Sequence, residues 1–571
     1  MPELSPSSTP CPEDSQPVPT ASRWAQVSRR YALLVMLLSA LYLLGSSLYG
    51  LSAPLAFGHH GYHVGEYSTR ARHTLRHGSI LPANLPGWNQ PAVENHYLHH
   101  PIGTHQMVTL TMGVLGEQVY AVRLAAVLYM LSTFAALGLL LWRRLGPWSA
   151  AAASVVFAVV PIHAWYGNHI DPGFPGLTCL LLFFFFYFQF LDEGKRRSAY
   201  LSLLFALLAG FFEWSPYLAA VPVFLHTLWR TRRQSWLYPF AYGVAVALPF
   251  VLHVAIVLYT HHLPEMREGY SSRTVMPPWS SLLHSLLGFS DALFGRALLY
   301  VTGFFVATRL VLMLLRGLRD LDVVGLSLAI SLAAYIKLFP VGVTIHQYRL
   351  LYGGTLAALA VGVLVNDALA LFRWLRPSLP SLLLAPVLSV LLSAGILWKT
   401  AQLSWHGLVE SRLHGGIIAQ RSFDPQLSRI EFVVHARELT QRGDVGYIHQ
   451  SFHLRKELYY YLDRDIAFSP SLIGVKALTE TAQARAFVLC NPRQMMPGER
   501  ALFDELALTH PVHMVDDFAV LDLRSQTPGR TTLQTRPSRQ PRSWLRRYFE
   551  GPYSRLELWG DSTAGLHIDA K

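Results

Sequence analysis

A histidine-rich stretch near the N-terminus carries the residues best suited to chemistry. Residues 59–105 hold nine of the 25 histidines of the chain and two acids, Glu66 and Glu94. A carboxylate can take a proton from a hydroxyl group, and imidazole nitrogens can hydrogen-bond hydroxyl and phosphate oxygens. The stretch is therefore predicted to bind a substrate that carries such groups.

A metal site is the alternative for the same stretch. Imidazole is a common transition-metal ligand, and six histidines could converge: His59, His60, His63, His99, His100 and His105. However, the stretch contains no HExxH motif and no fixed His-x-His pattern beside an acid. We therefore predict no metal ligands, and we keep a divalent metal as the less favoured alternative.

Three acids are candidates for a catalytic base. Glu66 stands four residues before Arg70, which is also the spacing of an ordinary ion pair on a solvated helix. Glu94 has a plain loop carboxylate as its alternative. Asp171 precedes Pro172 in a short link between apolar runs, where an acid often caps a helix or forms a turn. Both readings stay open for each acid.

The elements that position these residues are long apolar helices. The chain has 571 residues, of which 52% are hydrophobic and 14% charged, whereas soluble domains carry about 25% charged residues. A helix crosses the ~30 Å hydrocarbon layer with about 20 apolar residues. Eleven runs approach this length: 31–53, 122–142, 148–166, 173–191, 198–213, 216–229, 237–260, 297–315, 322–341, 350–371 and 380–398. The fold class is therefore a polytopic α-helical membrane protein.

Loop charge predicts the orientation of the chain. Short cytoplasmic loops accumulate Lys and Arg, and every second loop is basic, beginning with Arg143 and Arg144. The alternate loops, around Asp171 and Trp214, carry no Lys or Arg. This pattern predicts a cytoplasmic N-terminus, with the segment 54–121 and everything after about residue 400 on the outer side.

The chain divides into four predicted parts. Residues 1–22 are a disordered cytoplasmic tail, and 23–400 form the transmembrane domain, which includes the outer segment 54–121. Residues 401–525 alternate short helices and strands, which predicts an extracytoplasmic α/β domain. Residues 526–571 are basic and rich in Pro and Ser, which predicts a flexible tail.

Short motifs occur in a fixed order around the histidine-rich stretch. After the first apolar run come Ala71-Arg72-x-x-Leu75-x-x-Gly78, then Tyr97-Leu98-His99-His100-Pro101, then Gly116 and Val122-Arg123-Leu124. Over residues 55–125 this order resembles the GT-C glycosyltransferases, and within them glycosyltransferase family 39, which includes protein O-mannosyltransferases and aminoarabinose transferases. The span count, the motif His346-Gln347-Tyr348 and the C-terminal domain agree with the resemblance.

The resemblance implies a GT-C-like fold of about eleven transmembrane helices and an activity. A sugar would pass from a polyprenyl-phosphate donor to a glycan, lipid or protein acceptor on the outer side. A carboxylate would deprotonate the acceptor hydroxyl, and cations would stabilise the departing lipid phosphate. No cofactor is required by this chemistry, and nucleic acid is not an expected partner because the net charge of +12 is spread over short clusters.

The resemblance also implies roles for particular residues. In the family, the catalytic acid commonly lies several residues before the helix that ends in the motif Ala71-Arg72-x-x-Leu75-x-x-Gly78. Here the equivalent places hold His60 and His63, so Glu66 is the nearest substitute. The catalytic candidates are Glu66, Glu94 and Asp171. The candidates for binding the donor phosphate are His346, Arg349, Lys337 and Arg273, and those for binding substrate are His60, His63, His99, His100 and Tyr348.

Two other classes of protein compete with the enzyme. A transporter or lipid flippase usually shows internal repeats and helices interrupted near the bilayer midplane, whereas here no repeat is evident and the polar residues gather at the outer boundary. A membrane scaffold would need no lipid-phosphate ligand. The 41 Arg against 6 Lys indicate a GC-rich bacterial genome, so the expected location is the bacterial inner membrane.

Overall fold

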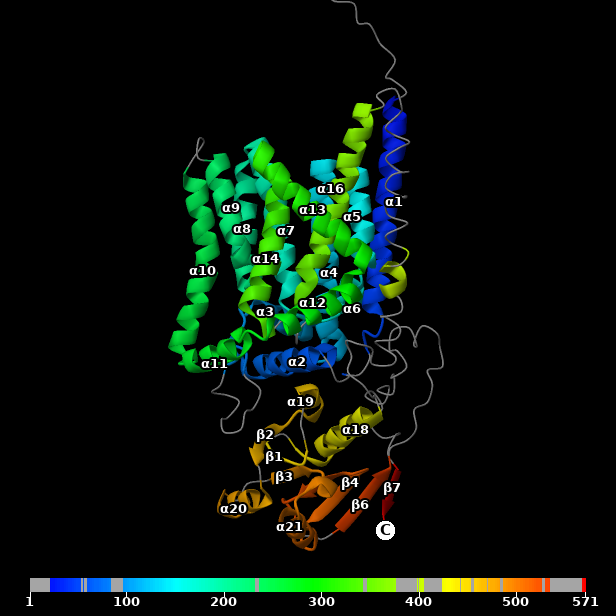
Figure 1. The fold of residues 1–571 in the computed structure, drawn as a ribbon. Helices are drawn as coiled ribbons and strands as arrows, with labels where there is room; N and C mark the ends of the chain where they lie inside the picture. Colours follow the sequence, from blue (N-terminus) through cyan, green and yellow to red (C-terminus); the bar gives the residue numbers. More distant parts are fainter. Residues whose placement is uncertain are drawn as a thin grey trace, which may run out of the picture.

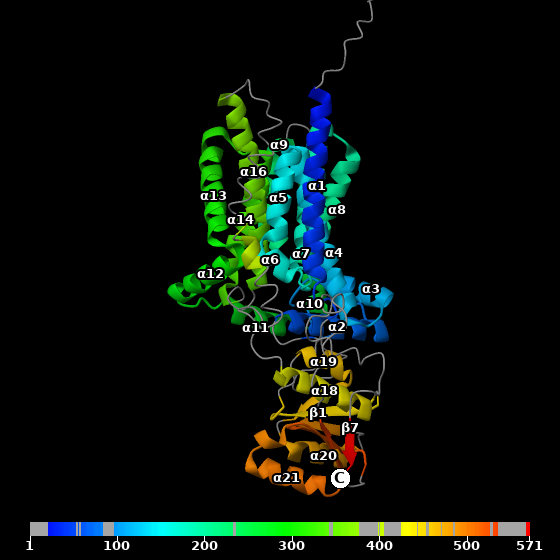
Figure 2. The same ribbon diagram turned by 90° about the vertical axis from the view of Figure 1, so that its right-hand side faces the viewer.

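The protein consists of a bundle of long helices with a smaller α/β unit at one end (Figures 1 and 2). The computed structural model describes residues 21–52, 55, 59–83, 96–231, 236–341, 347–375, 398, 400–404, 424–441, 443–452, 456–469, 471–482, 486–525, 529–534 and 567–570. The statements below concern these residues.

The bundle contains a helix for each predicted apolar run up to residue 371. In chain order these are α1 (Ala21–Leu48), α4 (Val119–Leu145), α5 (Pro147–Val159) with α6 (Pro161–Tyr166), α7 (Gly173–Glu193), α8 (Arg196–Phe212), α9 (Ser215–Thr231), α10 (Leu237–Tyr259), α13 (Arg296–Arg316), α14 (Asp320–Leu338) and α16 (Leu351–Leu375). Almost all of the predicted run 380–398 lies outside the described residues. The chain is thus a multi-pass integral membrane protein.

Fewer helices reach full membrane-spanning length than the eleven runs predict. Seven of the described helices are long and apolar enough to cross a membrane. The others are interrupted: α5 stops after 13 residues because Pro161 follows, and α8 and α9 have 17 residues each and are separated at Glu213. The backbone of Glu213 is extended. These breaks place polar residues at the end of the bundle.

Small residues allow the central helices to approach closely. α5 carries four consecutive alanines and packs against α1 and α16. A Cβ atom at Gly362 of α16 would lie 2.9 Å from the carbonyl oxygen of Ser149, so this contact requires glycine. Such close contacts are typical of helices in membranes. They fix the position of α16 and of the turn that precedes it, η1 (Gln347–Leu350). This turn carries Tyr348 and Arg349.

Four helices form a layer across the end of the bundle that faces the α/β unit. They are α2 (His59–His77), α3 (Gly103–Leu115), α11 (Leu263–Thr274) and α12 (Trp279–Phe294) (Figures 1 and 2). The sequence predicts an amphipathic α2 on the membrane surface, with Arg70 and Arg72 outside its apolar face. Instead both arginines are buried, because α2 lies between the bundle and the α/β unit.

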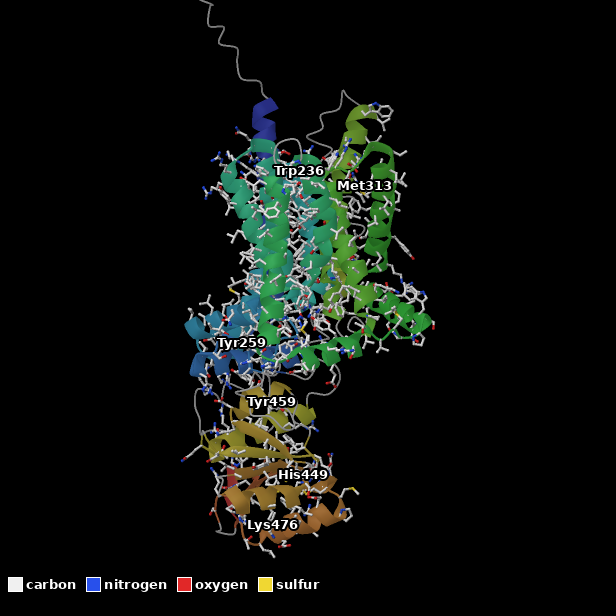
Figure 3. All side chains as sticks on the ribbon, turned by 90° about the vertical axis from the view of Figure 1, so that its left-hand side faces the viewer. Trp236, Tyr259, Met313, His449, Tyr459 and Lys476 are labelled. Carbon is white, nitrogen blue, oxygen red and sulfur yellow. The ribbon has the colours of Figure 1, made fainter. Side chains whose placement is uncertain are left out.

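The basic loops lie at the opposite end of the bundle. Arg143 and Arg144, at the end of α4, form ion pairs with Asp192, Glu193 and Asp320. In Figure 3, Trp236 and Met313 mark this end, whereas Tyr259 lies at the end that carries α2. The basic loops and the histidine-rich segment are therefore separated by the length of the bundle, as the loop charges predict.

The α/β unit contains a seven-stranded mixed sheet in the order β2-β1-β3-β5-β4-β6-β7. Its elements are α18 (Asp424–Leu439), β1 (Val445–His449), α19 (Lys456–Leu462), β2 (Asp465–Ser469), α20 (Leu472–Ala482), β3 (Ala486–Cys490), α21 (Pro497–Ala507), β4 (Pro511–Val515), β5 (Phe518–Asp522), β6 (Gly529–Gln534) and β7 (His567–Ala570). β1 pairs in parallel with β2 and β3, and β4 and β5 form an antiparallel hairpin. α18 and α19 pack on the face nearer the bundle, and α20 and α21 on the other.

Two strands lie in the region 526–571, for which the sequence predicts a flexible tail. β6 pairs in parallel with β4, and β7 pairs with β6. The β-branched pair Thr531-Thr532 favours an extended backbone, but the surrounding Arg, Pro and Ser residues hide this signal. The region therefore contains two strands of the sheet, and its flexibility stays a prediction.

Candidate active site

The functional candidates converge where the bundle meets the layer of α2. Five separate segments contribute: α2, the segment before α3, the α6–α7 connection, the junction of α8 and α9, and the turn η1 before α16. Arg349 of η1 is the centre of the group. Its guanidinium contacts Glu213 at 2.5 Å, Asp171 at 3.3 Å and His100 Nε2 at 3.4 Å. We call these four residues the Arg349 cluster.

Three members of the Arg349 cluster are almost completely buried. The exposed fractions of the side chains are 5% for Arg349, 1% for Asp171 and 0% for Glu213. Burying an unpaired charge costs several kcal/mol, so the two carboxylates depend on the single guanidinium between them. One guanidinium can balance only one of the two negative charges. The cluster therefore attracts protons and cations.

Asp171 combines the two roles that the sequence leaves open. Its Oδ1 accepts a hydrogen bond of 2.8 Å from the N–H of Gly173 at the start of α7, which is a turn-forming contact. Its Oδ2 faces Arg349. Burial raises the pKa of Asp171 above its ordinary value, Arg349 opposes this shift, and Glu213 adds to it. A carboxylate with a raised pKa is a better proton acceptor than a solvated one.

Aromatic and imidazole rings line the neighbouring space. The hydroxyl of Tyr348 hydrogen-bonds Nε2 of His63 at 2.9 Å, and the His169 ring centroid lies 4.6 Å from that of Tyr348 and 5.0 Å from that of His63. These groups can hydrogen-bond the hydroxyls of a sugar. They also bring His63 of the outer segment beside Asp171 of the α6–α7 connection.

A divalent metal would find one set of ligands among the described residues. His63, His169 and Asp171 each offer a donor atom, and these atoms lie within 4.8 Å of one another. Two imidazoles and a carboxylate suit Zn²⁺ or Fe²⁺. However, Asp171 Oδ2 already faces the Arg349 guanidinium, and His63 is engaged by Tyr348. The donor set fits a metal chemically, but two of its three residues are already held by protein partners.

Glu66 lies one helical turn from His63 and forms the expected pair with Arg70. The pair is buried rather than solvated, with exposed fractions of 4% and 1%. The Arg70 guanidinium also stacks on Tyr97, 3.5 Å from the ring centroid. Glu66 is therefore held by its neighbour, whereas Asp171 is shared within the Arg349 cluster.

The motif Tyr97-Leu98-His99-His100 is fixed by side chains of three other elements. The carbonyl of His99 accepts hydrogen bonds from the indole of Trp214 at 3.0 Å and the hydroxyl of Tyr270 at 3.1 Å. The His99 ring turns toward α11, 3.5 Å from Glu265. His100 instead contacts Arg349, so the two adjacent histidine rings point to different elements.

The remaining candidates lie at the edge of the site or outside the described residues. Arg273 is half-buried on α11 near Tyr270. Burial raises the pKa of Tyr270, and the positive charge of Arg273 opposes this shift. Lys337 is exposed in the last turn of α14. Among the described residues neither cation forms an ion pair. Glu94, His346 and the side chain of His60 lie outside the described part of the chain.

The sequence reading missed Glu213 as a site residue. This acid is fully buried and bonds Arg349. The signal was present, because an acid between two apolar runs is costly in a membrane and usually has a partner. His169 and Tyr166 were also missed, since a single buried histidine or tyrosine in an apolar helix end has no distinguishing pattern.

Comparisons with known proteins find one family that matches part of the chain and solved structures with a similar fold. Residues 99–259 match the family described as dolichyl-phosphate-mannose-protein mannosyltransferase, while no curated protein sequence matches the chain. The structure of ArnT from Cupriavidus metallidurans bound to undecaprenyl phosphate is similar with a TM-score of 0.55 and 14% identity, over 88% of this chain and 98% of that one. The Archaeoglobus fulgidus oligosaccharyltransferase in the apo form gives a TM-score of 0.51 and 10% identity, over 87% and 75%.

At these identities the two structures establish a shared fold, and the family match adds a sequence relationship in the region that contains Asp171 and Glu213. The chain therefore shares the GT-C fold of these two structures, and residues 99–259 are similar in sequence to a mannosyltransferase family.

Proposed function

We propose that the protein is a glycosyltransferase that moves a sugar from a polyprenyl-phosphate donor to an acceptor hydroxyl on the outer, periplasmic side of a bacterial inner membrane. The observation that carries the proposal is the Arg349 cluster, which buries two carboxylates and a guanidinium where the bundle meets the outer layer. The related fold of ArnT was determined with undecaprenyl phosphate, which supports a lipid-phosphate donor.

Asp171 is the proposed base. It takes the proton of the acceptor hydroxyl while that oxygen bonds to the anomeric carbon, and the bond from this carbon to the phosphate oxygen breaks. Arg349 holds Asp171 in place, and His63 and Tyr348 bind sugar hydroxyls. Arg273 and Lys337 stabilise the departing phosphate, because both are cations without an ion-pair partner among the described residues.

The proposed sidedness rests on charge. The basic loops lie at the end opposite to α2, and basic loops are typical of the cytoplasmic side. The Arg349 cluster and the α/β unit then face the periplasm.

Purified protein in lipid vesicles tests the proposal directly. Radiolabelled polyprenyl-phosphate pentoses and hexoses are supplied with a lipid or glycan acceptor extract, and the release of polyprenyl phosphate is measured with transfer of the label. Label transfer that needs both substrates is expected. Movement of intact donor across the vesicle membrane, without cleavage of its sugar, would instead identify a flippase.

Substitution of the two edge cations is expected to weaken donor binding. Arg273→Gln and Lys337→Gln should each raise the KM for the donor about tenfold, since each removes one charged contact to phosphate. kcat should fall as well, because negative charge grows on the phosphate as it departs and each cation stabilises that charge. Arg197→Gln, an exposed cation at the opposite end, is the matched control. Equal KM values in all three variants would contradict the assignment.

Removal of divalent metal is expected to leave transfer intact. Arg349 already faces Asp171, and the Tyr348 hydroxyl bonds Nε2 of His63, so two of the three candidate ligands are held by protein partners without a cation. Initial rates are measured after treatment with EDTA and with 1,10-phenanthroline. Loss of activity that Zn²⁺ or Mn²⁺ restores, and that His169→Ala abolishes, would assign the three residues as metal ligands instead.

A further inference from the structure

The helix α2 is held on two opposite faces by different parts of the chain. At 3.6 residues per turn, positions 63, 66 and 70 share one face, and positions 72 and 76 share the other. The first face turns to the bundle and carries His63, Glu66 and Arg70. The second carries two arginines and turns to the α/β unit, and Figure 1 shows α19 directly beyond α2.

The second face is tied to the α/β unit by a ring of four charges. Arg72 contacts Glu117 at 2.8 Å and Asp463 at 3.1 Å, and Arg76 contacts the same two acids at 2.8 and 2.6 Å. Glu117 lies between α3 and α4, and Asp463 follows α19. Because positive and negative groups alternate, each charge has two opposite neighbours, and three chain segments are joined at one point.

Tyrosines of α19 extend this contact. Arg72 donates a hydrogen bond of 2.9 Å to the carbonyl of Tyr460, and its guanidinium lies 4.5 Å from the centroid of that ring. The Tyr460 hydroxyl donates to the carbonyl of Glu117, and the Tyr461 hydroxyl accepts from the N–H of Leu55. Figure 3 shows the neighbouring Tyr459 on the side of the α/β unit that faces the bundle.

The backbone of Asp463 is adapted to this contact. Its φ angle is +49°, in the left-handed region that only a few non-glycine residues adopt, Asp and Asn foremost. This conformation ends α19 and directs the carboxylate to Arg72 and Arg76. An uncommon backbone conformation persists only where the surrounding structure maintains it. Its presence at a charged contact between the two units indicates that Asp463 has a role in this contact.

We propose that the α/β unit is a positioning element for α2, and that Asp463 is its principal positioning residue. By holding Arg72 and Arg76, it fixes the rotation of α2 about its axis and so keeps His63 beside Asp171 and Tyr348. The effect on catalysis rests on the proposed function. The effect on α2 itself does not.

Hydrogen exchange of the full-length protein in lipid nanodiscs tests the structural half. Asp463→Asn keeps a side chain that tolerates the left-handed backbone and removes the charge. Exchange of the α2 amides, residues 59–77, is expected to rise about tenfold, while exchange in α7 stays unchanged. The matched control is Asp444→Asn, which removes a buried acid paired with Arg524 at 2.5 Å inside the α/β unit. Unchanged α2 exchange in Asp463→Asn would overturn the proposal.

Transfer assays on the same variants test the catalytic half. A fall in kcat with little change in the donor KM is expected for Asp463→Asn but not for Asp444→Asn, since a displaced α2 affects alignment rather than donor capture. Faster α2 exchange with an unchanged kcat would overturn the positioning role. If the unmodified protein transfers no sugar, the proposed function fails, whereas the exchange result still decides whether Asp463 holds α2.

Discussion

Replacing Arg349 by methionine is expected to abolish sugar transfer and to lower the free energy of unfolding by about 3–5 kcal/mol. Methionine replaces the apolar stem of the side chain but leaves Asp171 and Glu213 buried without their cation. One of the two carboxylates must then take up a proton or draw in water. Thermal unfolding of the purified protein and donor turnover are the measurements.

Two comparisons separate this effect from a general loss of arginine. Arg296→Met removes an exposed arginine paired with Asp291 at 2.9 Å, and exposed pairs contribute only about 0–1 kcal/mol. Its stability and activity should stay near those of the unmodified protein. In the double variant Arg349→Met with Glu213→Gln, part of the stability should return but transfer should not. A stable, active Arg349→Met variant would contradict the role of the cluster.

Asp171→Asn is expected to lower kcat about 10²–10⁴-fold, the usual contribution of a general base. Asparagine has the same shape, and its oxygen can still accept the hydrogen bond from Gly173 that begins α7. The fold should therefore survive while the proton acceptor is lost. Single-turnover rates with saturating donor measure the chemical step without the influence of binding.

Glu66→Gln is the matched comparison for Asp171→Asn. Glu66 is held by Arg70 on the same helix, so its replacement should disturb the position of Arg70 and reduce kcat much less than Asp171→Asn does. The opposite ranking, with a nearly inactive Glu66→Gln and an active Asp171→Asn, would transfer the role of base to Glu66.

The sequence by itself determined the membrane class, the positions of the helices and much of the α/β unit. These features depend on local properties: apolar runs, Pro and Gly at breaks, and the alternation of basic loops. Strand β1 and the hairpin of β4 and β5 are readable for the same reason, since a short strand bounded by polar residues is evident along the chain. The ordered motifs from Ala71 to Leu124 also indicated the resemblance to GT-C glycosyltransferases, and the structures of two such enzymes share the fold.

Only the tertiary structure decided which polar groups meet. Arg349 lies 178 residues after Asp171 and 136 after Glu213 in the chain, so their contact depends on how α7, α9 and α16 cross. Glu66 and Arg70 have the same spacing in a solvated and in a buried helix, and their burial comes from the bundle side of α2, where Tyr97 covers the Arg70 guanidinium. Periodicity reports which face of a helix is apolar. It carries no information on which neighbour covers that face, and therefore none on the partner of a buried charge.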